Sequence, residues 1–313
     1  MQQSGTECEF CSSDSWVILS PIEQSIKRKI EAVGTPLKDW DIQINYGIKT
    51  GCNEAFIIST EKRNEILANC KDEAERKRTD DIIRPILRGR DIKRYGYEWA
   101  DLWLIATFPA RNYDIEEYPA VKDYLLSFAE NKLRDAGYHW VADRYLADFC
   151  KQKLEQTGNF VEIAGENIKI GNTPEKARKK TSNKWFETQD SISYWDLFFQ
   201  PHICWKAVGR KLAFSLVEGG VYLTAPASFI SAGVYNETIL HYLCSPVGAY
   251  FVFKNSDTTG AGDIMLNIQS LIQFPIPKVL LDTGGLDIQQ INHMIYKMYD
   301  FSSSEIEYIE SQL

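Results

Sequence analysis

The chain has 313 residues, and its 44% hydrophobic and 12% aromatic content supports a sizeable core in one large domain or two smaller ones. The net charge of −8 argues against a nucleic-acid ligand unless the basic residues are gathered on one face. No apolar run approaches the length of a membrane span, and the N-terminus lacks the regions of a secretory signal. We therefore expect a cytoplasmic protein with no membrane partner.

Seven cysteines are scattered along the chain, an odd number that favours reduced thiols over a disulfide framework. Cys8 and Cys11 form a C-x-x-C pair, but a zinc site needs two further ligands and no second pair follows. The histidines His139, His202, His241 and His293 have no metal-ligand spacing either. We expect no metal site in this chain.

The first elements are predicted from capping and alternation. Ser20, Pro21 and Glu23 form a capping box that predicts a helix over residues 21–33. Residues 41–46 alternate apolar and polar, as in a half-buried strand, and residues 55–58 are expected to be a second strand. The polar turn between them contains Gly51 and Asn53, which suit positive φ, so the pattern predicts a β-hairpin.

The remaining elements alternate between helical and extended patterns. In chain order we expect a helix in 61–78, a strand over 102–106, a helix over 116–133, a helix over 144–155, a hairpin around 164–167, strands over 201–208, 211–217 and 221–230, a helix pair over 236–253, a loop over 258–262 and a last helix capped by Ser302. The chain therefore predicts an α+β fold with a mixed or antiparallel sheet, peripheral helices and a C-terminal helical tail.

Two segments concentrate the basic residues. Residues 84–94 hold five basic residues and one acid, for a net charge of +4, and residues 176–184 hold five basic residues and no acid. An acidic chain with two such segments can still present a basic face to phosphates. Each segment can equally be solvent-exposed: the first paired with neighbouring acids, the second as a mobile loop.

Several motifs follow one another in a recognisable order. They are Trp16, residues 47–56, 85–92, 118–125, 180–187, 202–205, 259–262 and 275–277. In this order they resemble the C-terminal specificity domain of TaqI-like adenine methyltransferases and type IIG restriction-modification enzymes. The chain departs from the family pattern at His202, where lysine is more common, and at residues 243–246.

The resemblance implies a domain organisation and a function. It implies an N-terminal tail or linker (1–15), a target-recognition domain (16–280) with a variable insertion (137–183), and a C-terminal helical segment (281–313). Such a domain reads duplex DNA, while a separate N-terminal domain binds S-adenosylmethionine and methylates a flipped adenine. No Asn-Pro-Pro-Tyr, Gly-rich cofactor loop or nuclease motif occurs here, so we expect no catalytic residue and no cofactor in this chain.

Three groups of residues are candidates for DNA contact. Lys49, Thr50 and Asn53 lie at a polar turn, which can enter a groove or can be a purely conformational turn. The basic segments supply candidate phosphate ligands, and three more basic residues flank a strand turn. These residues are Arg84, Arg88, Arg90, Lys93, Arg94, Lys176, Arg178, Lys179, Lys180, Lys184, Lys206, Arg210 and Lys211.

The expected partners are double-stranded DNA and an N-terminal methyltransferase domain, and two alternatives stay open. The chain could be a stand-alone specificity subunit that docks onto a separate methyltransferase. Its docking face would then come from Ile288, Ile291, Ile295, Met298 and Tyr299. It could also be a free-standing nuclease, although the missing motifs make this the least favoured interpretation.

Overall fold

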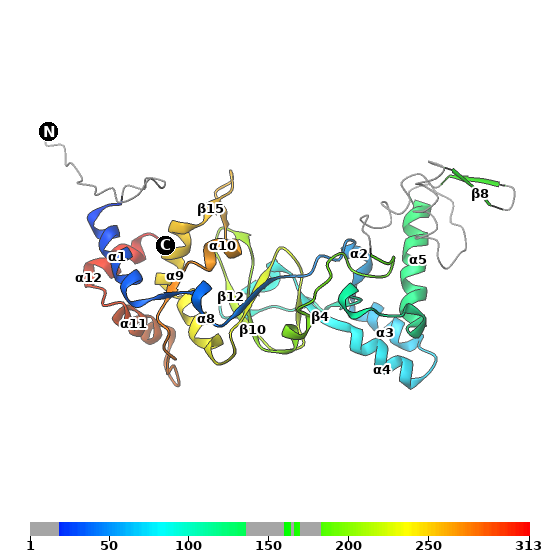
Figure 1. Ribbon diagram of the computed structural model, residues 1–313, viewed down its shortest axis with the longest axis horizontal. Coiled ribbons are helices and arrows are strands. Elements are labelled where there is room, and N and C mark those ends of the chain that lie inside the picture. The colour runs from blue at the N-terminus through cyan, green and yellow to red at the C-terminus, as the bar shows by residue number, and fades with distance from the viewer. Residues whose placement is uncertain (1–18, 136–159, 164–165, 170–182) are drawn as a thin grey trace.

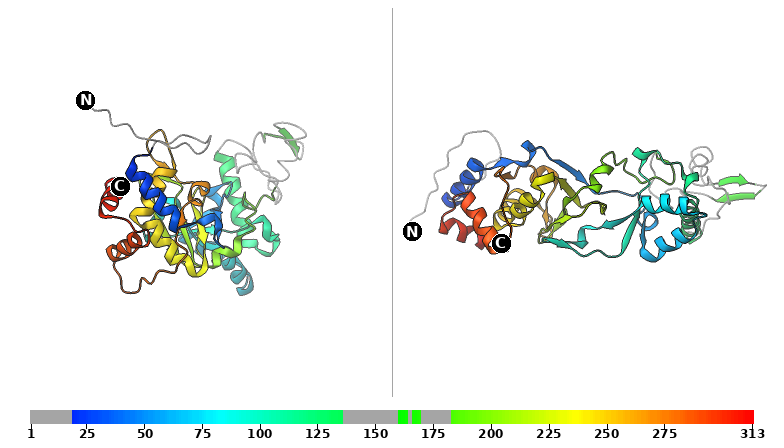
Figure 2. Two further views of the ribbon diagram at one scale, coloured as in Figure 1. Left: turned by 60° about the vertical axis from the view of Figure 1, so that its left-hand side comes forward. Right: turned by 90° about the horizontal axis from the view of Figure 1, so that it is seen from below.

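The computed structural model describes residues 19–135, 160–163, 166–169 and 183–313, and it is elongated (Figure 1). Helices α1, α11 and α12 gather at one end, α3, α4 and α5 at the other, and the main strands lie between them (Figure 1). A turned view shows the same long outline (Figure 2). The expected tail (1–15), the Cys8–Cys11 pair, Trp16 and the expected helix over 144–155 lie outside the described residues.

The helices have the following bounds. They are α1 (Pro21–Val33), α2 (Asn53–Phe56), α3 (Thr60–Ala68), α4 (Glu73–Ile82), α5 (Pro119–Asp135), α8 (Asn236–Cys244), α9 (Pro246–Asn255), α10 (Ile268–Leu271), α11 (Ile288–Met298) and α12 (Ser303–Ser311). The capping boxes of α1 and α12 are present, with Ser20 and Ser302 accepting backbone hydrogen bonds as predicted. The helix pair expected over 236–253 is also confirmed.

A central antiparallel sheet is largely buried on both faces, except along one edge strand over residues 43–46. Its strands are β12 (Phe214–Val217), β10 (His202–Trp205), β14 (Ser228–Ser231) and β2 (Gln43–Tyr46), in that order. On β10, Cys204 packs into one hydrophobic core while Ile203 and Trp205 pack into the other. Because successive side chains of a strand point to opposite faces, the side chains of this one sheet line both hydrophobic cores.

A second, mixed sheet lies beside the first and belongs to one core only. Its order is β13 (Tyr222–Leu223), β4 (Ile83–Leu87), β7 (Leu102–Ile105) and β3 (Ile57–Ser59), with β13 parallel to β4 and the other pairs antiparallel. Ile66, Ile82 and Val121 from α3, α4 and α5 pack in the same core. The two sheets together confirm the expected α+β class with mixed and antiparallel pairing.

Small strand pairs connect the larger elements. They are β1 (Thr35–Pro36) with β17 (Pro275–Ile276), β5 (Ile92–Lys93) with β6 (Gly96–Tyr97), β11 (Val208–Gly209) and β15 (Asp257–Thr258) with β16 (Ile264–Met265), and β8 (Phe160–Ile163) with β9 (Glu166–Lys169). The last pair flanks the position of the expected hairpin around 164–167.

The hairpin predicted from residues 41–58 is wrong. Strand β2 pairs with β14 in the central sheet, whereas β3 pairs with β7 in the mixed sheet. Ala55 and Phe56 are helical rather than extended, and both are buried. Each strand finds a partner far away in sequence, and the local alternation of apolar residues contains no information about that partner.

Other boundaries also differ from the sequence pattern. The charged stretch 61–78 is not one helix, because α3 ends at Ala68 and Asp72 caps a new helix, α4, through a hydrogen bond to the Glu75 backbone. The strands expected over 201–208, 211–217 and 221–230 are shorter, and the last stretch is divided into β13 and β14. Side-chain caps and turns thus end helices and strands within stretches whose hydrophobic or charged pattern continues in the sequence.

The C-terminal helices belong to the second core. Ile291, Ile295, Tyr299 and Ile309 are buried there together with Ile26 of α1. The docking face expected from α11 is therefore largely covered by this chain itself, and among its members Ile288 is exposed. The domain boundaries expected from the resemblance stay predictions.

Two ion pairs join the first helix to the last part of the chain. Lys29 of α1 lies 2.8 Å from Glu305 of α12, and Lys254 of α9 lies 2.7 Å from Glu23 of α1. Burial opposes ionisation of Glu305, but hydrogen bonds from Lys29, Ser25 and Ser302 outweigh it and lower its pKa to about 2. Both carboxylates are thus stabilised in the charged form, and each ties α1 to a distant helix.

The Glu305→Gln variant is expected to lose about 2 kcal/mol of unfolding free energy at pH 7, because the charged pair with Lys29 is lost. Since the folded-state pKa of Glu305 is depressed, its stabilisation is present above about pH 4.5 and disappears as the pH falls towards 2. Urea titrations at several pH values will measure this. A deficit that stays constant from pH 7 to pH 2.5 would contradict it.

Candidate nucleic-acid interface

The turn at residues 47–53 is fixed by its own hydrogen bonds. The Thr50 side chain is buried; its hydroxyl donates to Asn53 Oδ1 at 2.7 Å and accepts from the Cys52 backbone at 3.1 Å. Gly51 has φ of 80°, as expected, whereas Asn53 begins α2. This geometry accounts for Thr50 and Asn53 as parts of the turn and leaves Lys49 as its exposed polar side chain.

Arg88 has a structural partner within its own segment. Its backbone N–H and its Nε both donate to Asp91 Oδ2, at 2.8 and 2.9 Å, and Nη2 donates to Oδ1 at 2.8 Å. Burial raises the pKa of Asp91, but the hydrogen bonds from Arg88 outweigh this effect and lower it overall. The pair closes the short 3-10 turn at Gly89–Asp91, so the Arg88 side chain stabilises this turn through Asp91 and has a structural role.

The structure brings together basic residues from two distant segments. The Tyr95 backbone donates to the Phe214 carbonyl at 2.9 Å, and a side chain at Gly89 would meet Lys206 Cβ at 3.3 Å. The segment around β5 therefore lies against the strands β10 to β12. We call the basic residues gathered here the cationic patch: Arg90, Lys93, Arg94, Lys206, Arg210 and Lys211.

Acidic residues neutralise little of this patch. Lys93 pairs with Glu98 at 3.3 Å, and Arg210, whose side chain is 86% exposed, lies 4.0 Å from Asp263. Such exposed pairs contribute little and are readily exchanged for other anions. Among the residues that the structure describes, Arg90, Lys206 and Lys211 form no ion pair with a carboxylate.

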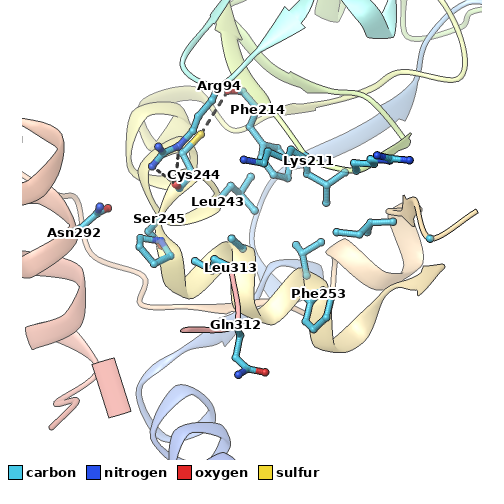
Figure 3. Close-up of a pocket in the computed structure, with 17 residues that line it drawn as sticks. Arg94, Lys211, Phe214, Leu243, Cys244, Ser245, Phe253, Asn292, Gln312 and Leu313 are labelled. Atoms are coloured by element: carbon cyan, nitrogen blue, oxygen red, sulfur yellow. Dashed lines mark hydrogen bonds between the residues drawn. The ribbon is translucent and has the colours of Figure 1, made fainter. Parts of the chain in front are cut away.

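Arg94 is held by a backbone group rather than by an acid. Its Nε and Nη2 donate to the Cys244 carbonyl at 3.1 and 2.7 Å. It lines a pocket of about 500 Å³ together with Arg210, Lys211 and the ring of Phe253 (Figure 3). Residues 243–246, which depart from the family pattern, form the turn between α8 and α9 that contains the Cys244 carbonyl, and Ser245 caps α9.

The other predicted residues lie elsewhere. Arg84 pairs with Asp81 at 3.6 Å and stacks over Phe199. The Lys184 ammonium donates to the Tyr113 carbonyl at 3.4 Å, and the Lys49 backbone carbonyl accepts the Gln189 backbone N–H at 3.1 Å. Lys176, Arg178, Lys179 and Lys180 lie outside the described residues, so the placement of the second basic segment as a whole stays a prediction.

His202 is an internal residue in this fold. It is fully buried, its Nδ1 lies 2.9 Å from the Gln200 carbonyl, and burial lowers the pKa of the ring. A neutral imidazole here fills the core beside Phe198 and Phe229, so the departure from lysine removes no surface charge from the patch.

Within the described ranges, no helix is long and apolar enough to cross a bilayer. In the same part of the chain, no group of His, Cys, Asp and Glu side chains has the arrangement of a metal site. The described cysteines Cys52, Cys70, Cys204 and Cys244 form no disulfide.

Sequence reasoning missed one exposed basic residue. Arg111 ends a short 3-10 turn (Pro109–Arg111), and its guanidinium lies 4.0 Å from the centre of the Trp195 ring. Nothing in the local sequence marked it, because Arg111 and Trp195 are brought together by a contact between distant loops.

Neighbouring arginines are expected to behave differently on substitution. Arg88→Ala is expected to cost about 2 kcal/mol of unfolding free energy, because it leaves the buried Asp91 carboxylate without its partner. Arg90→Ala, at an exposed side chain, is expected to change stability by less than about 0.5 kcal/mol. Chemical denaturation of both variants will compare them, and equal effects would contradict the structural role of Arg88.

Comparison with known proteins gives structural similarity alone. No family profile matches the chain, and no curated protein sequence matches it. The type IIG restriction endonuclease BpuSI is similar with a TM-score of 0.47 and 12% identity over 93% of this chain. The type IIL restriction-modification enzyme MmeI, solved in complex with DNA, has the same TM-score and identity over 88% of this chain. This chain spans 31% and 36% of those two chains, and similarity at this level leaves the function to be argued from its own residues.

Proposed function

We propose that this chain is a sequence-specific duplex-DNA recognition module of a restriction-modification or phage-defence adenine methyltransferase. The observation that carries the proposal is the cationic patch, in which basic residues from 90–94 and 206–211 meet although the chain is acidic overall. The order of motifs along the sequence supports the same function independently of this geometry.

The chemistry of the patch suits phosphate groups. Arginine grips a phosphate with two parallel N–H groups, and lysine provides a mobile point charge. Of the six residues, Lys93 and Arg210 have exposed acidic neighbours, and Arg94 is oriented by a neutral carbonyl. The patch therefore retains most of its charge for an external polyanion. Phosphate contacts of this kind position a duplex, and other side chains read its bases.

The methyl-transfer chemistry belongs to another module in this proposal. A neighbouring domain or subunit would bind S-adenosylmethionine and receive the flipped adenine, while this chain sets the register on the duplex. Lys49 and the residues around Lys184 remain candidates for base reading, because the hydrogen bond from the Gln189 backbone to the Lys49 carbonyl brings their two loops together.

Duplex binding is expected to depend steeply on salt. If the six residues of the patch each neutralise about one phosphate, the slope of log K against log salt concentration is about −5. The double variant Arg210→Ala/Lys211→Ala is expected to reduce the magnitude of that slope by about 2. Fluorescence anisotropy with a labelled duplex at several salt concentrations will measure both slopes.

The matched control is Arg28→Ala, which removes an exposed arginine from α1. It is expected to leave the slope unchanged. An equal change in the control and in the patch variant, or a wild-type slope near zero, would contradict the assignment of the patch to phosphate binding.

A second candidate is a stand-alone specificity subunit that binds a separate methyltransferase. The burial of Ile291, Ile295 and Tyr299 covers most of the face that sequence suggested for this docking, which counts against this candidate. The genomic reading frame directly upstream of Met1 decides between them: a continuous frame that encodes Asn-Pro-Pro-Tyr supports the first candidate.

A nuclease is tested by incubating the chain with plasmid DNA and Mg²⁺, for which we expect no cleavage.

A further inference from the structure

The part of the chain that the structure describes contains two arginine–tryptophan stacks with different surroundings. Arg63 lies 4.1 Å from the centre of the Trp103 ring, but it also pairs with Asp80 and its side chain is only 18% exposed. Arg111 lies 4.0 Å from the Trp195 ring and is exposed; no carboxylate pairs with it in the part of the chain that the structure describes. The first stack is thus satisfied within the fold, whereas the second retains an unneutralised charge.

The second stack continues into a larger surface. Trp195 meets Phe199 edge-to-face at 6.0 Å, and Phe199 is 40% exposed. The guanidinium of Arg84 lies 5.6 Å from the Phe199 ring, and its side chain is 29% exposed and also pairs with the exposed Asp81 at 3.6 Å, a pair that an external anion can replace. We call Arg84, Arg111, Trp195 and Phe199 the arginine–aromatic surface. Its two aromatic rings lie between two guanidinium groups, in the order Arg111, Trp195, Phe199 and Arg84.

The backbone under this surface is held firmly. The loop that carries Arg111 is fixed by a hydrogen bond from the Ala110 backbone to the Ser191 carbonyl at 3.1 Å. Trp195 and Phe199 are the first and last residues of one 3-10 helix, which is anchored by the fully buried Phe198. The two aromatic rings and Arg111 are therefore supported by rigid neighbours rather than by a mobile loop.

The turn before this helix is strained. Ile192 is buried and adopts φ of 51°, a left-handed conformation that a β-branched residue rarely takes. Its carbonyl accepts the Trp195 backbone N–H at 3.3 Å, so the strained residue sets the position of the tryptophan. Backbone strain of this kind is retained mainly where it serves a site.

We propose that the arginine–aromatic surface binds an unpaired nucleobase of single-stranded DNA. The base stacks on the Arg111–Trp195 pair or on Phe199, and the two guanidinium groups contact the flanking phosphates. Stacking on aromatic rings and guanidinium planes is the common way in which proteins hold unpaired bases. In a duplex the faces of the bases are already covered, so this chemistry selects an unpaired strand.

This proposal does not depend on the proposed function. The arginine–aromatic surface and the cationic patch share no residue, and the patch requires only a phosphate backbone. Duplex recognition and binding of an unpaired base can therefore be lost separately.

The test measures anisotropy of a fluorescein-labelled single-stranded 20-mer and of the matching duplex with the full chain. Trp195→Ala and Arg111→Ala are each expected to weaken single-strand binding about tenfold, since stacking contributes about 1–3 kcal/mol per base. Trp195→Phe, which keeps an aromatic ring, is expected to lose less than about threefold. Duplex affinity is expected to stay within about twofold for all three variants.

Two controls separate this effect from loss of charge and loss of folding. Arg28→Ala removes an exposed arginine of α1, outside this surface, and Trp99→Ala removes another partly exposed tryptophan. Both are expected to bind the single strand as wild type does, and thermal melting of every variant checks folding. If Trp195→Ala does not fold, Arg111→Ala and Phe199→Ala carry the test.

The proposal is overturned if the wild-type chain does not bind the single strand. It is also overturned if folded Arg111→Ala binds it as tightly as wild type, or if single-strand and duplex affinities fall together. Loss of duplex binding in the Arg210→Ala/Lys211→Ala variant alone would affect the proposed function and not this surface.

Discussion

The rest of the structure depends on one constraint, which is that the two inner strands of the central antiparallel sheet, β10 and β14, are buried on both faces. Cys204 and Phe229 face one core, whereas Ile203, Trp205 and Ile230 face the other. Strand β10 is buried at every position, so a polar group on it must be neutral or hydrogen-bonded, and burial favours the neutral ring of His202. The two ends of the elongated molecule are joined through this layer, so neither end has an apolar core of its own that is complete without the sheet.

This arrangement also places the cationic patch. Strand β12 contributes Phe214 to the second core and accepts the Tyr95 backbone N–H, which brings the basic segment after β4 next to Arg210 and Lys211. The patch is therefore a consequence of how the small β5–β6 pair lies against the central sheet. Residues more than 100 positions apart share a surface because the β5–β6 pair lies against edge strand β12, which follows Arg210 and Lys211 in the chain.

The elements with local signals were predictable from sequence. The α1 and α12 capping boxes, the burial of β7 and the α8–α9 pair follow from short-range patterns. The hairpin predicted over 41–58 does not form, because β2 and β3 pair in different sheets. This pairing depends on tertiary packing and not on the local sequence. In the site, the sequence showed that residues 84–94 are basic. It did not show that Arg88 pairs with Asp91 instead of remaining available to a ligand. Arg111 gave no signal, because its stack on Trp195 exists only after folding.

The hydrogen bonds from Arg94 to the Cys244 carbonyl have a consequence for recognition by this patch. A lysine such as Lys211 must give up several rotamers when it meets an anion, which costs up to about 2 kcal/mol of conformational entropy. Arg94 has already lost that freedom, because two of its N–H groups are fixed on a main-chain oxygen. Its remaining donors are presented in one direction before any anion arrives. In the proposed phosphate-binding patch, the turn between α8 and α9 thus fixes the direction of one guanidinium, whereas an exposed lysine such as Lys211 is oriented only by the anion itself.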